Sequence, residues 1–439
     1  MSEIVYRMAA LLRRLLLWVP IGTNLGLLYL LLALVSGRFL SSRGAVFPAL
    51  ADLGLPDEAV RRAEAALCYG RWRIADLLLA WRHVVVREGL WQAHCYEGLR
   101  PVACDLVGFF RPRLSGCAGK HFHSAAQRAL PAVVLALVAE VGHVGQQRLA
   151  LPRLLLRQEP GDKSEADLQT RTLRQASRNL AQDEALLVDA GFALAQILAC
   201  GVPRFVVRLA KNATARRNYL PVYKGKGRPP EYGERVRPLP RNRKGETIRA
   251  SAPDKTARWK AGGRTIRADL FENLTLCEAK PGSASFRMVV IFDPLYGNPL
   301  VLATNLWVSA YALWCLYRER WPIEQLPLAA KQMLGAERAF VFAKESRQRL
   351  PELALLAGNV LSYVAATSTA VATGFWDRAA RPTCGRLRRA LSRTHFSDLP
   401  LSEGQFRKKE SVTAHLPKGV KAHRRRKVST MSPELRKAA

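Results

Sequence analysis

Four polar residues in the segment YRERWPIEQLPLAAK are spaced like side chains on one face of a helix. They are separated by three, four and seven positions: Tyr317, Arg320, Glu324 and Lys331. At about 100° per residue, a helix would project all four side chains within an arc of roughly 60°. This face would set one carboxylate beside two cations and a phenol, an arrangement that suits a divalent metal ion and a phosphate group.

The same spacing also fits an ordinary amphipathic helix, in which the charges form a solvated face and Glu324 pairs with Arg320. Pro327 removes a backbone donor and is expected to kink the helix between Glu324 and Lys331. The neighbouring motifs decide between the two interpretations, and the position of Lys331 is the least fixed of the four.

The four residues match the signature Tyr-x2-Arg-x3-Glu-x6-Lys at every position. The chain therefore resembles the bacterial transposases of the insertion-sequence-four family, whose catalytic triad is Asp, Asp, Glu. The resemblance implies a DDE transposase, an enzyme that cleaves DNA at transposon ends and transfers the strands into target DNA. It also implies a β-rich insertion in the catalytic domain and a homodimer in a synaptic complex on paired ends.

The chain of 439 residues is strongly basic, with a net charge of +33 from 68 Lys and Arg against 35 Asp and Glu. This length predicts two or three domains, and 49% hydrophobic residues can support a core. Such a charge is typical of proteins that bind nucleic acid, although a GC-rich genome that favours arginine codons could explain part of it. Double-stranded DNA is therefore the expected partner.

Cysteine usage and the apolar run from Ile21 to Val35 indicate the compartment. The eight cysteines show no C-x-x-C spacing, which predicts neither a disulfide framework nor a zinc ribbon and favours a reduced cytosol. The apolar run is about five residues short of a membrane span and contains Asn24, so we expect a buried helix and no membrane partner. The expected location is the bacterial cytoplasm, in association with the nucleoid.

Apolar periodicity and charge predict five regions along the chain. The expected fold class is α/β, with a ribonuclease-H-like catalytic domain preceded by an all-helical domain. The regions are a helical DNA-binding domain (1–98), the first part of the catalytic core (99–212), a basic β-rich insertion (213–285), the second part of the core with the Glu324 helix (286–372), and a basic C-terminal region with a disordered tail (373–439).

The pattern of the first core region is three strands, a helix, a strand, a helix and a strand, as expected of a ribonuclease-H-like domain. The first helix is predicted from Ser164 to Leu180, with Ser164 as N-cap and Asp167 at the third helical position. After the insertion, FRMVVIFDPLYGNPLVLATNL predicts a hairpin. An apolar helix is predicted from Leu350 to Val371.

Asp105 and Asp189 are the predicted partners of Glu324. Asp105 lies in the apolar pattern VACDLVGF, where an unpaired carboxylate would be costly to bury unless a metal ion neutralised it. Asp189 ends LLVDAGF, where a strand runs into a helix at the carboxyl edge of the sheet. The family motif Asp-x-Gly-aromatic matches there. The alternatives are a solvated or ion-paired strand end for Asp105 and a helix N-cap for Asp189.

Other residues are predicted to contact DNA. Arg320 and Lys331 would hold phosphate, and Tyr317 would donate a hydrogen bond beside them. Further contacts are expected from Arg111, Lys120, Arg208 and Lys211, although ordinary surface polarity is the alternative for the last two. Nearby acidic residues are poorer catalytic candidates: Asp183, Glu184, Asp293 and Glu319, the last because it points elsewhere on the helix.

The resemblance implies that Asp105, Asp189 and Glu324 coordinate two Mg2+ or Mn2+ ions. Two such ions can activate an oxygen nucleophile and relieve charge on the leaving oxygen in phosphodiester transfer. Two other function classes stay open. The triad also fits a structure-specific DNA nuclease, which cuts without joining, and the chain could be a noncatalytic DNA-binding protein derived from a transposase.

Overall fold

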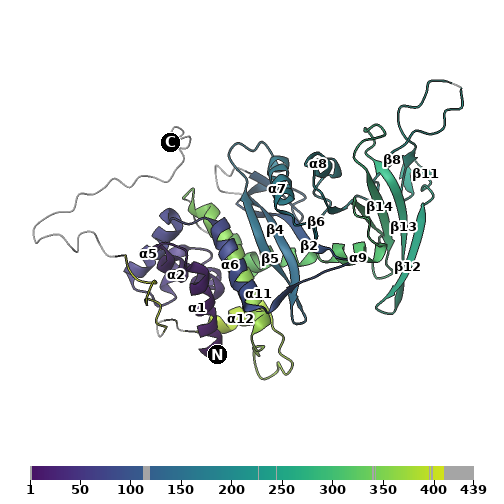
Figure 1. The fold of residues 1–439 in the computed structure, drawn as a ribbon. Coiled ribbons are helices and arrows are strands. Elements are labelled where there is room, and N and C mark those ends of the chain that lie inside the picture. The colour runs from purple at the N-terminus through teal and green to yellow at the C-terminus, as the bar shows by residue number, and fades with distance from the viewer. Residues whose placement is uncertain are drawn as a thin grey trace, which may run out of the picture. The chain divides into compact units, whose positions relative to one another are not determined.

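The computed structural model describes residues 2–111, 119–225, 227–243, 245–338, 341, 343–394, 396 and 399–409. Its contacts divide the chain into two compact units. The helical unit comprises Met1–Arg87 and Leu328–Ala439, and the sheet unit comprises Glu88–Pro327. The protein is thus mixed α/β with one large sheet (Figure 1). The predicted disordered tail, from residue 410 onward, lies outside the described residues.

Helix α11 (Ser346–Thr367) is the centre of the helical unit and is almost entirely buried. Trp81 of α6 (Ile74–Glu88) donates a 2.7 Å hydrogen bond to Asn359 and packs edge to face on Tyr363. Four helices pack on α11 (Figure 1): α1 (Ser2–Leu16), α2 (Thr23–Val35), α5 (Asp57–Tyr69) and α12 (Cys384–Leu391). Two short helices, α3 (Arg38–Ser41) and α4 (Val46–Ala51), pack on α2.

Two of these helices are strongly apolar. The predicted buried helix after Ile21 is confirmed, since twelve of the thirteen residues of α2 are buried. Among the described residues, α11 is the one helix long and apolar enough to cross a membrane, and 89% of its apolar window is buried inside the protein. This burial is typical of a core helix.

The sheet unit contains the predicted three strands, helix, strand, helix and strand in that order, with one further strand, β3 (Gly119–His123), between the first two. Strands β2, β4 and β5 form antiparallel pairs, and β2, β6 and β7 form parallel pairs. Short strand β1 (Trp91–Ala93) pairs with the end of β4, so the region expected to be all helical ends in a strand. The elements are β2 (Arg100–Phe110), β4 (Arg128–Val144), β5 (Gln147–Arg157), α7 (Glu165–Asn179), β6 (Glu184–Val188), α8 (Leu194–Ala199) and β7 (Phe205–Arg208).

The start of α7 confirms the predicted cap. Ser164 is the N-cap in extended conformation, and Asp167 completes a capping box with it. The Asp167 carboxylate accepts from the backbone N–H groups of Lys163 and Ser164. These bonds satisfy amides that no helical carbonyl can reach. The helix packs its apolar face on β4 and β5 through residues such as Leu168.

Beyond β7, the sheet continues with strands from later in the chain. The predicted hairpin is confirmed as β14 (Phe286–Phe292) and β15 (Leu300–Thr304), and β15 pairs with β7. Strand β13 pairs with β14, so the polar segment of residues 213–285, predicted as a β-rich insertion, joins the same sheet. Its strands are β8 (Ala215–Arg217), β9 (Arg235–Val236), β12 (Lys255–Ala261) and β13 (Arg264–Thr275), with β10 (Arg241–Arg243) and β11 (Glu246–Ile248) as a separate pair.

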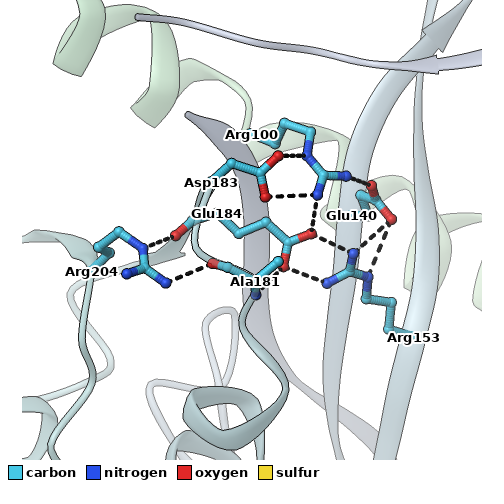
Figure 2. A network of polar contacts seen from close by, with 7 residues as sticks. All are labelled: Arg100, Glu140, Arg153, Ala181, Asp183, Glu184 and Arg204. Carbon is cyan, nitrogen blue, oxygen red and sulfur yellow. Dashed lines mark hydrogen bonds and ion pairs between the residues drawn. The ribbon is translucent and has the colours of Figure 1, made fainter. Parts of the chain in front are cut away.

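A buried ion-pair network fixes the first residues of β2 and β6 (Figure 2). Glu140 and Glu184 are 1% and 0% exposed, and Arg153 contacts both carboxylates. Arg100 also contacts both and binds Asp183 at the surface. Burial would raise the pKa of Glu184, but Arg153 and Arg100 hold it below its usual range. The Glu184 carboxylate therefore stays ionised, with a cation beside it.

Candidate active site

Asp105 and Asp189 lie side by side on adjacent parallel strands. The register of β2 and β6 pairs Cys104 with Val188, so the next residues on the two strands are the two aspartates. Asp189 begins the turn into α8, where its carboxylate accepts a 2.5 Å hydrogen bond from the Gly191 N–H. Asp189 thus follows the carboxyl end of β6, where the notable neighbour is Asp105 in the middle of β2.

The third predicted acid, Glu324, lies in a segment that does not form one continuous helix. Helix α9 (Ala310–Arg318) ends before Arg320, and a 3-10 turn η1 (Trp321–Glu324) follows. Short α10 (Gln325–Leu328) and the π-helical η2 (Ala329–Met333) come next. The expectation of a single helical face across the four signature residues is therefore wrong.

The two prolines explain the break. Pro322 has no N–H with which to bond the Arg318 carbonyl four residues earlier, and Pro327 has none for the carbonyl of Ile323. The Arg318 carbonyl instead accepts from Nη1 of Arg148, at 3.3 Å. The kink expected at Pro327 thus begins earlier, just ahead of Pro322.

Arg320 links Glu324 to Asp105. Its Nη2 donates to Oε1 of Glu324, and its Nη1 lies 3.9 Å from Oδ2 of Asp105. The Arg320 side chain is 12% exposed, whereas that of Glu324 is 40% exposed. The guanidinium therefore lies between two acids that come from distant parts of the sequence.

The protonation of Asp105 reflects this crowding. Burial raises the pKa of Asp105 to about 6, and the neighbouring carboxylates of Asp189 and Glu324 act in the same direction. The Arg320 guanidinium and the Leu106 N–H oppose them. Asp189 and Glu324 are thus both close enough to Asp105 to act on it electrostatically.

The donors suit a hard divalent cation, because Mg2+ and Mn2+ prefer carboxylate oxygen. In the described part of the chain, no group of three or more His, Cys, Asp or Glu side chains is arranged to hold a metal ion. The positive charge beside Asp105 and Glu324 is instead that of Arg320. The chemistry of the three carboxylates fits a metal, but only with Arg320 displaced from its position between them.

Tyr317, the first signature residue, packs on the inner side of this site. It is 9% exposed, and the Arg320 guanidinium lies 5.9 Å from its ring centroid. Burial raises the pKa of the Tyr317 hydroxyl, although Arg320 and Arg208 act against this. The hydroxyl therefore keeps its proton at neutral pH and can donate a hydrogen bond.

A pocket of about 720 Å³ adjoins Tyr317 and Arg320 within the sheet unit. Its walls combine cations with aromatic rings, including Arg148, Arg208, Arg318, Trp314, Trp321 and Tyr296. Arg318 lies 4.4 Å from the Trp314 ring centroid, and Arg148 lies 5.8 Å from that of Trp321. A cationic, partly aromatic pocket beside carboxylates suits a nucleotide segment of DNA.

The remaining predicted contact residues are dispersed. Arg208, at the end of β7, lines this pocket, and Lys211 lies close by, with its ammonium 2.6 Å from Oδ1 of Asn298. Lys120 is exposed on β3 (Gly119–His123). Arg111 is 8% exposed and donates to the carbonyl of Phe110, so it is more buried than a surface contact requires. Lys331 belongs to the helical unit.

Sequence reasoning did not find Arg148 or Trp321 as site residues. Arg148 is the second residue of β5, more than a hundred positions from the signature, and only the fold brings it to the pocket. Trp321 was identifiable, because it directly follows the signature arginine in the sequence, and the structure places it on the pocket wall.

A comparison of the chain with models of known protein families finds no matching family, and a comparison with curated proteins finds no matching sequence.

Proposed function

We propose that this protein is a DDE transposase with a ribonuclease-H-like catalytic core. The observation that carries the proposal is the convergence of three acids from separate stretches of sequence. Asp189 lies beside Asp105, and Arg320 lies between Asp105 and Glu324. The strand and helix succession and the parallel pairing of β2 with β6 support the fold. The signature and the net charge of +33 support DNA as the substrate.

The three carboxylates would hold two Mg2+ or Mn2+ ions, which when bound would activate an oxygen nucleophile and stabilise the leaving oxygen. Arg320 would bind a phosphate oxygen once it leaves Glu324, because its guanidinium matches phosphate as well as carboxylate. Arg208, on the pocket wall, would bind a neighbouring phosphate.

Tyr317 would act beside Arg320 as a hydrogen-bond donor. Its raised pKa keeps the hydroxyl protonated, so it would donate to a phosphate oxygen rather than accept a proton from water. Because Tyr317 and Arg320 both border the pocket, the DNA strand would enter from that side.

The proposal extends to the setting of the reaction. A transposase of this type would act as a homodimer that pairs two transposon ends, in the bacterial cytoplasm on nucleoid DNA. A structure-specific nuclease would use the same acids and would cut without joining, so a strand-transfer assay with a labelled 3′-hydroxyl end distinguishes the two. A noncatalytic DNA-binding protein would not nick DNA at all.

The decisive test is Glu324→Gln in the full chain. This variant keeps the size of the side chain and removes its charge, so DNA cleavage in Mg2+ or Mn2+ should be abolished while DNA affinity stays nearly unchanged. Glu278→Gln is the matched control, since Glu278 is an exposed carboxylate of the same unit. Cleavage by Glu324→Gln at the rate of this control would overturn the proposed role.

A further inference from the structure

Glu319 is a buried carboxylate that the proposed function does not use. It lies in the turn between the end of α9 at Arg318 and the start of η1 at Trp321, which we call the corner. It is 4% exposed and occupies the C-cap of α9, immediately before Arg320. An ionised side chain in such a place costs free energy unless specific partners compensate for the lost water. Its partners therefore indicate what the charge does.

Both oxygens of Glu319 are held by groups far away in sequence. The Tyr96 hydroxyl donates to Oε1 at 2.8 Å, and Nδ1 of His94 lies 2.9 Å from Oε2. Arg148 lies 3.9 Å from Oε1. Burial alone would raise the pKa of Glu319, but these three groups hold it below its usual range.

The partners are themselves fixed by the sheet. His94 follows β1 and stacks on His143 of β4, with ring centroids 4.8 Å apart and planes 21° apart. Tyr96 lies in the turn that a backbone bridge closes onto Leu99. The carboxylate of Glu319 is thus tied to the edge of the sheet near β1 and β4.

Arg148 contacts the corner at two further points. It donates to the Arg318 carbonyl, the acceptor that Pro322 leaves without a helical partner, and its guanidinium lies against the ring of Trp321. One side chain thus contacts residues on both sides of Glu319.

The corner needs such support because helical hydrogen bonds do not carry through it. Around Glu319 the backbone makes short-range bonds, from the N–H of Glu319 to the Leu316 carbonyl, from that of Arg320 to Tyr317 and from that of Ile323 to Arg320. These bonds define a turn but leave the angle between α9 and η1 to tertiary contacts. That angle decides where Arg320 and Glu324 point.

We propose that Glu319 is a positioning residue, whose contacts with His94, Tyr96 and Arg148 fix the corner that carries Arg320 and Glu324. The role of those two residues in metal and phosphate binding rests on the proposed function, whereas the anchoring of the corner does not. Loss of the anchor would let η1 move, so the carboxylate of Glu324 would no longer be held opposite the two aspartates.

The test uses Trp321 as a local reporter in the full-length protein. With 5-fluorotryptophan incorporated, the Trp321 resonance is assigned in the 19F spectrum by comparison with Trp321→Phe. Glu319→Gln should shift and broaden this resonance. Glu184→Gln is the matched control: it also removes a buried, arginine-paired carboxylate of the sheet unit, at the first residue of β6 (Figure 2), and should leave the resonance in place.

Tyr96→Phe is a milder second variant, because it deletes one hydrogen bond without altering a charge. It should produce a smaller change of the same kind. An unchanged Trp321 resonance in both Glu319→Gln and Tyr96→Phe would overturn the inference, whether or not the protein acts on DNA.

A second readout connects the corner to metal binding. Binding of Mn2+ to the DNA complex, followed by electron paramagnetic resonance, should weaken about tenfold in Glu319→Gln, as is usual when a residue that orients a ligand is lost. Glu184→Gln should bind Mn2+ like the wild type. Equal Mn2+ affinity in Glu319→Gln and the wild type would overturn the link to the site. A displaced Trp321 in a protein whose wild type neither binds Mn2+ nor nicks DNA would support the anchor and overturn the proposed function.

Discussion

Nη1 of Arg320 lies 3.9 Å from Oδ2 of Asp105, while Nη2 of the same guanidinium bonds Glu324. This cation therefore partly neutralises a site that carries three carboxylates. On binding, divalent ions would replace the guanidinium as the partner of the carboxylates. A DNA phosphate would replace the carboxylates as the partner of the guanidinium.

Arg320→Gln tests this double role. Removing the charge should lower DNA cleavage by on the order of a hundredfold, a typical effect of losing one group that stabilises developing charge. DNA affinity should change by less than about threefold, because many other cations contribute. Millimolar guanidinium added to Arg320→Ala should restore part of the activity. Arg267→Gln, which loses an exposed arginine paired with Asp269, is the control and should cleave normally.

Asp105→Asn should make the protein more stable above about pH 6. The pKa of Asp105 is raised in the folded state, so the folded protein binds more protons than the unfolded chain between about pH 4 and pH 6, and stability falls as the pH rises through this window. Above it the carboxylate opposes folding. Since the side chain is 28% exposed, we expect a gain of only about 1 to 2 kcal/mol at pH 7.

Urea denaturation of the wild type and variant at pH 4.5 and pH 7.5 measures this difference. Asp293→Asn supplies a control of opposite sign, because Arg264 holds the pKa of Asp293 below its usual range. That variant should lose stability at pH 7.5. A destabilised Asp105→Asn at pH 7.5 would contradict the raised pKa.

Binding to nonspecific duplex DNA should weaken steeply with salt. With a net charge of +33, phosphate contacts release counterions, and the association constant should fall roughly a hundredfold or more between about 50 and about 200 mM salt. Fluorescence anisotropy of a labelled duplex measures the slope. Lys211→Met should lower the slope by about one phosphate contact. If the association constant of the wild type did not change with salt, the basic surface would not be a DNA-binding surface.

Arg153→Met should destabilise the protein by roughly 3 kcal/mol, because it leaves Glu140 and Glu184 buried with one arginine fewer. Thermal and urea unfolding of the full chain would show the loss. Arg174→Met removes an exposed arginine of α7 and should change the free energy of unfolding by less than about 0.5 kcal/mol. Similar stabilities of the two variants would show that the network contributes little.

The strands and helices around the aspartates were predictable because their signals are local. Apolar patterns gave β2, β6 and the hairpin of β14 and β15, and the Ser164 cap gave the start of α7. Asp189 could be placed because a strand that runs into Gly191 must turn, and the turn sets the carboxylate at the sheet edge.

The shape of the corner at Glu319 was not predictable, because it depends on contacts between distant residues. Helical spacing treated Glu319 as a residue on another face, yet its partners His94 and Tyr96 lie more than two hundred positions earlier. Pro322 alone signals that the Arg318 carbonyl lacks a helical donor, but not that Arg148 supplies one. Periodicity describes a single element and cannot reveal which other element completes it.

The pairing of β13 with β14 limits how this protein can be altered. Strand β14 is buried along nearly its whole length, and β13 covers one of its two hydrogen-bonding edges. Excising the polar segment of residues 213–285 would leave a bare row of amide and carbonyl groups on an apolar strand, the kind of surface that seeds aggregation. Despite its polar composition, this segment is part of the sheet, and its deletion for crystallisation or engineering would lower the solubility of the protein.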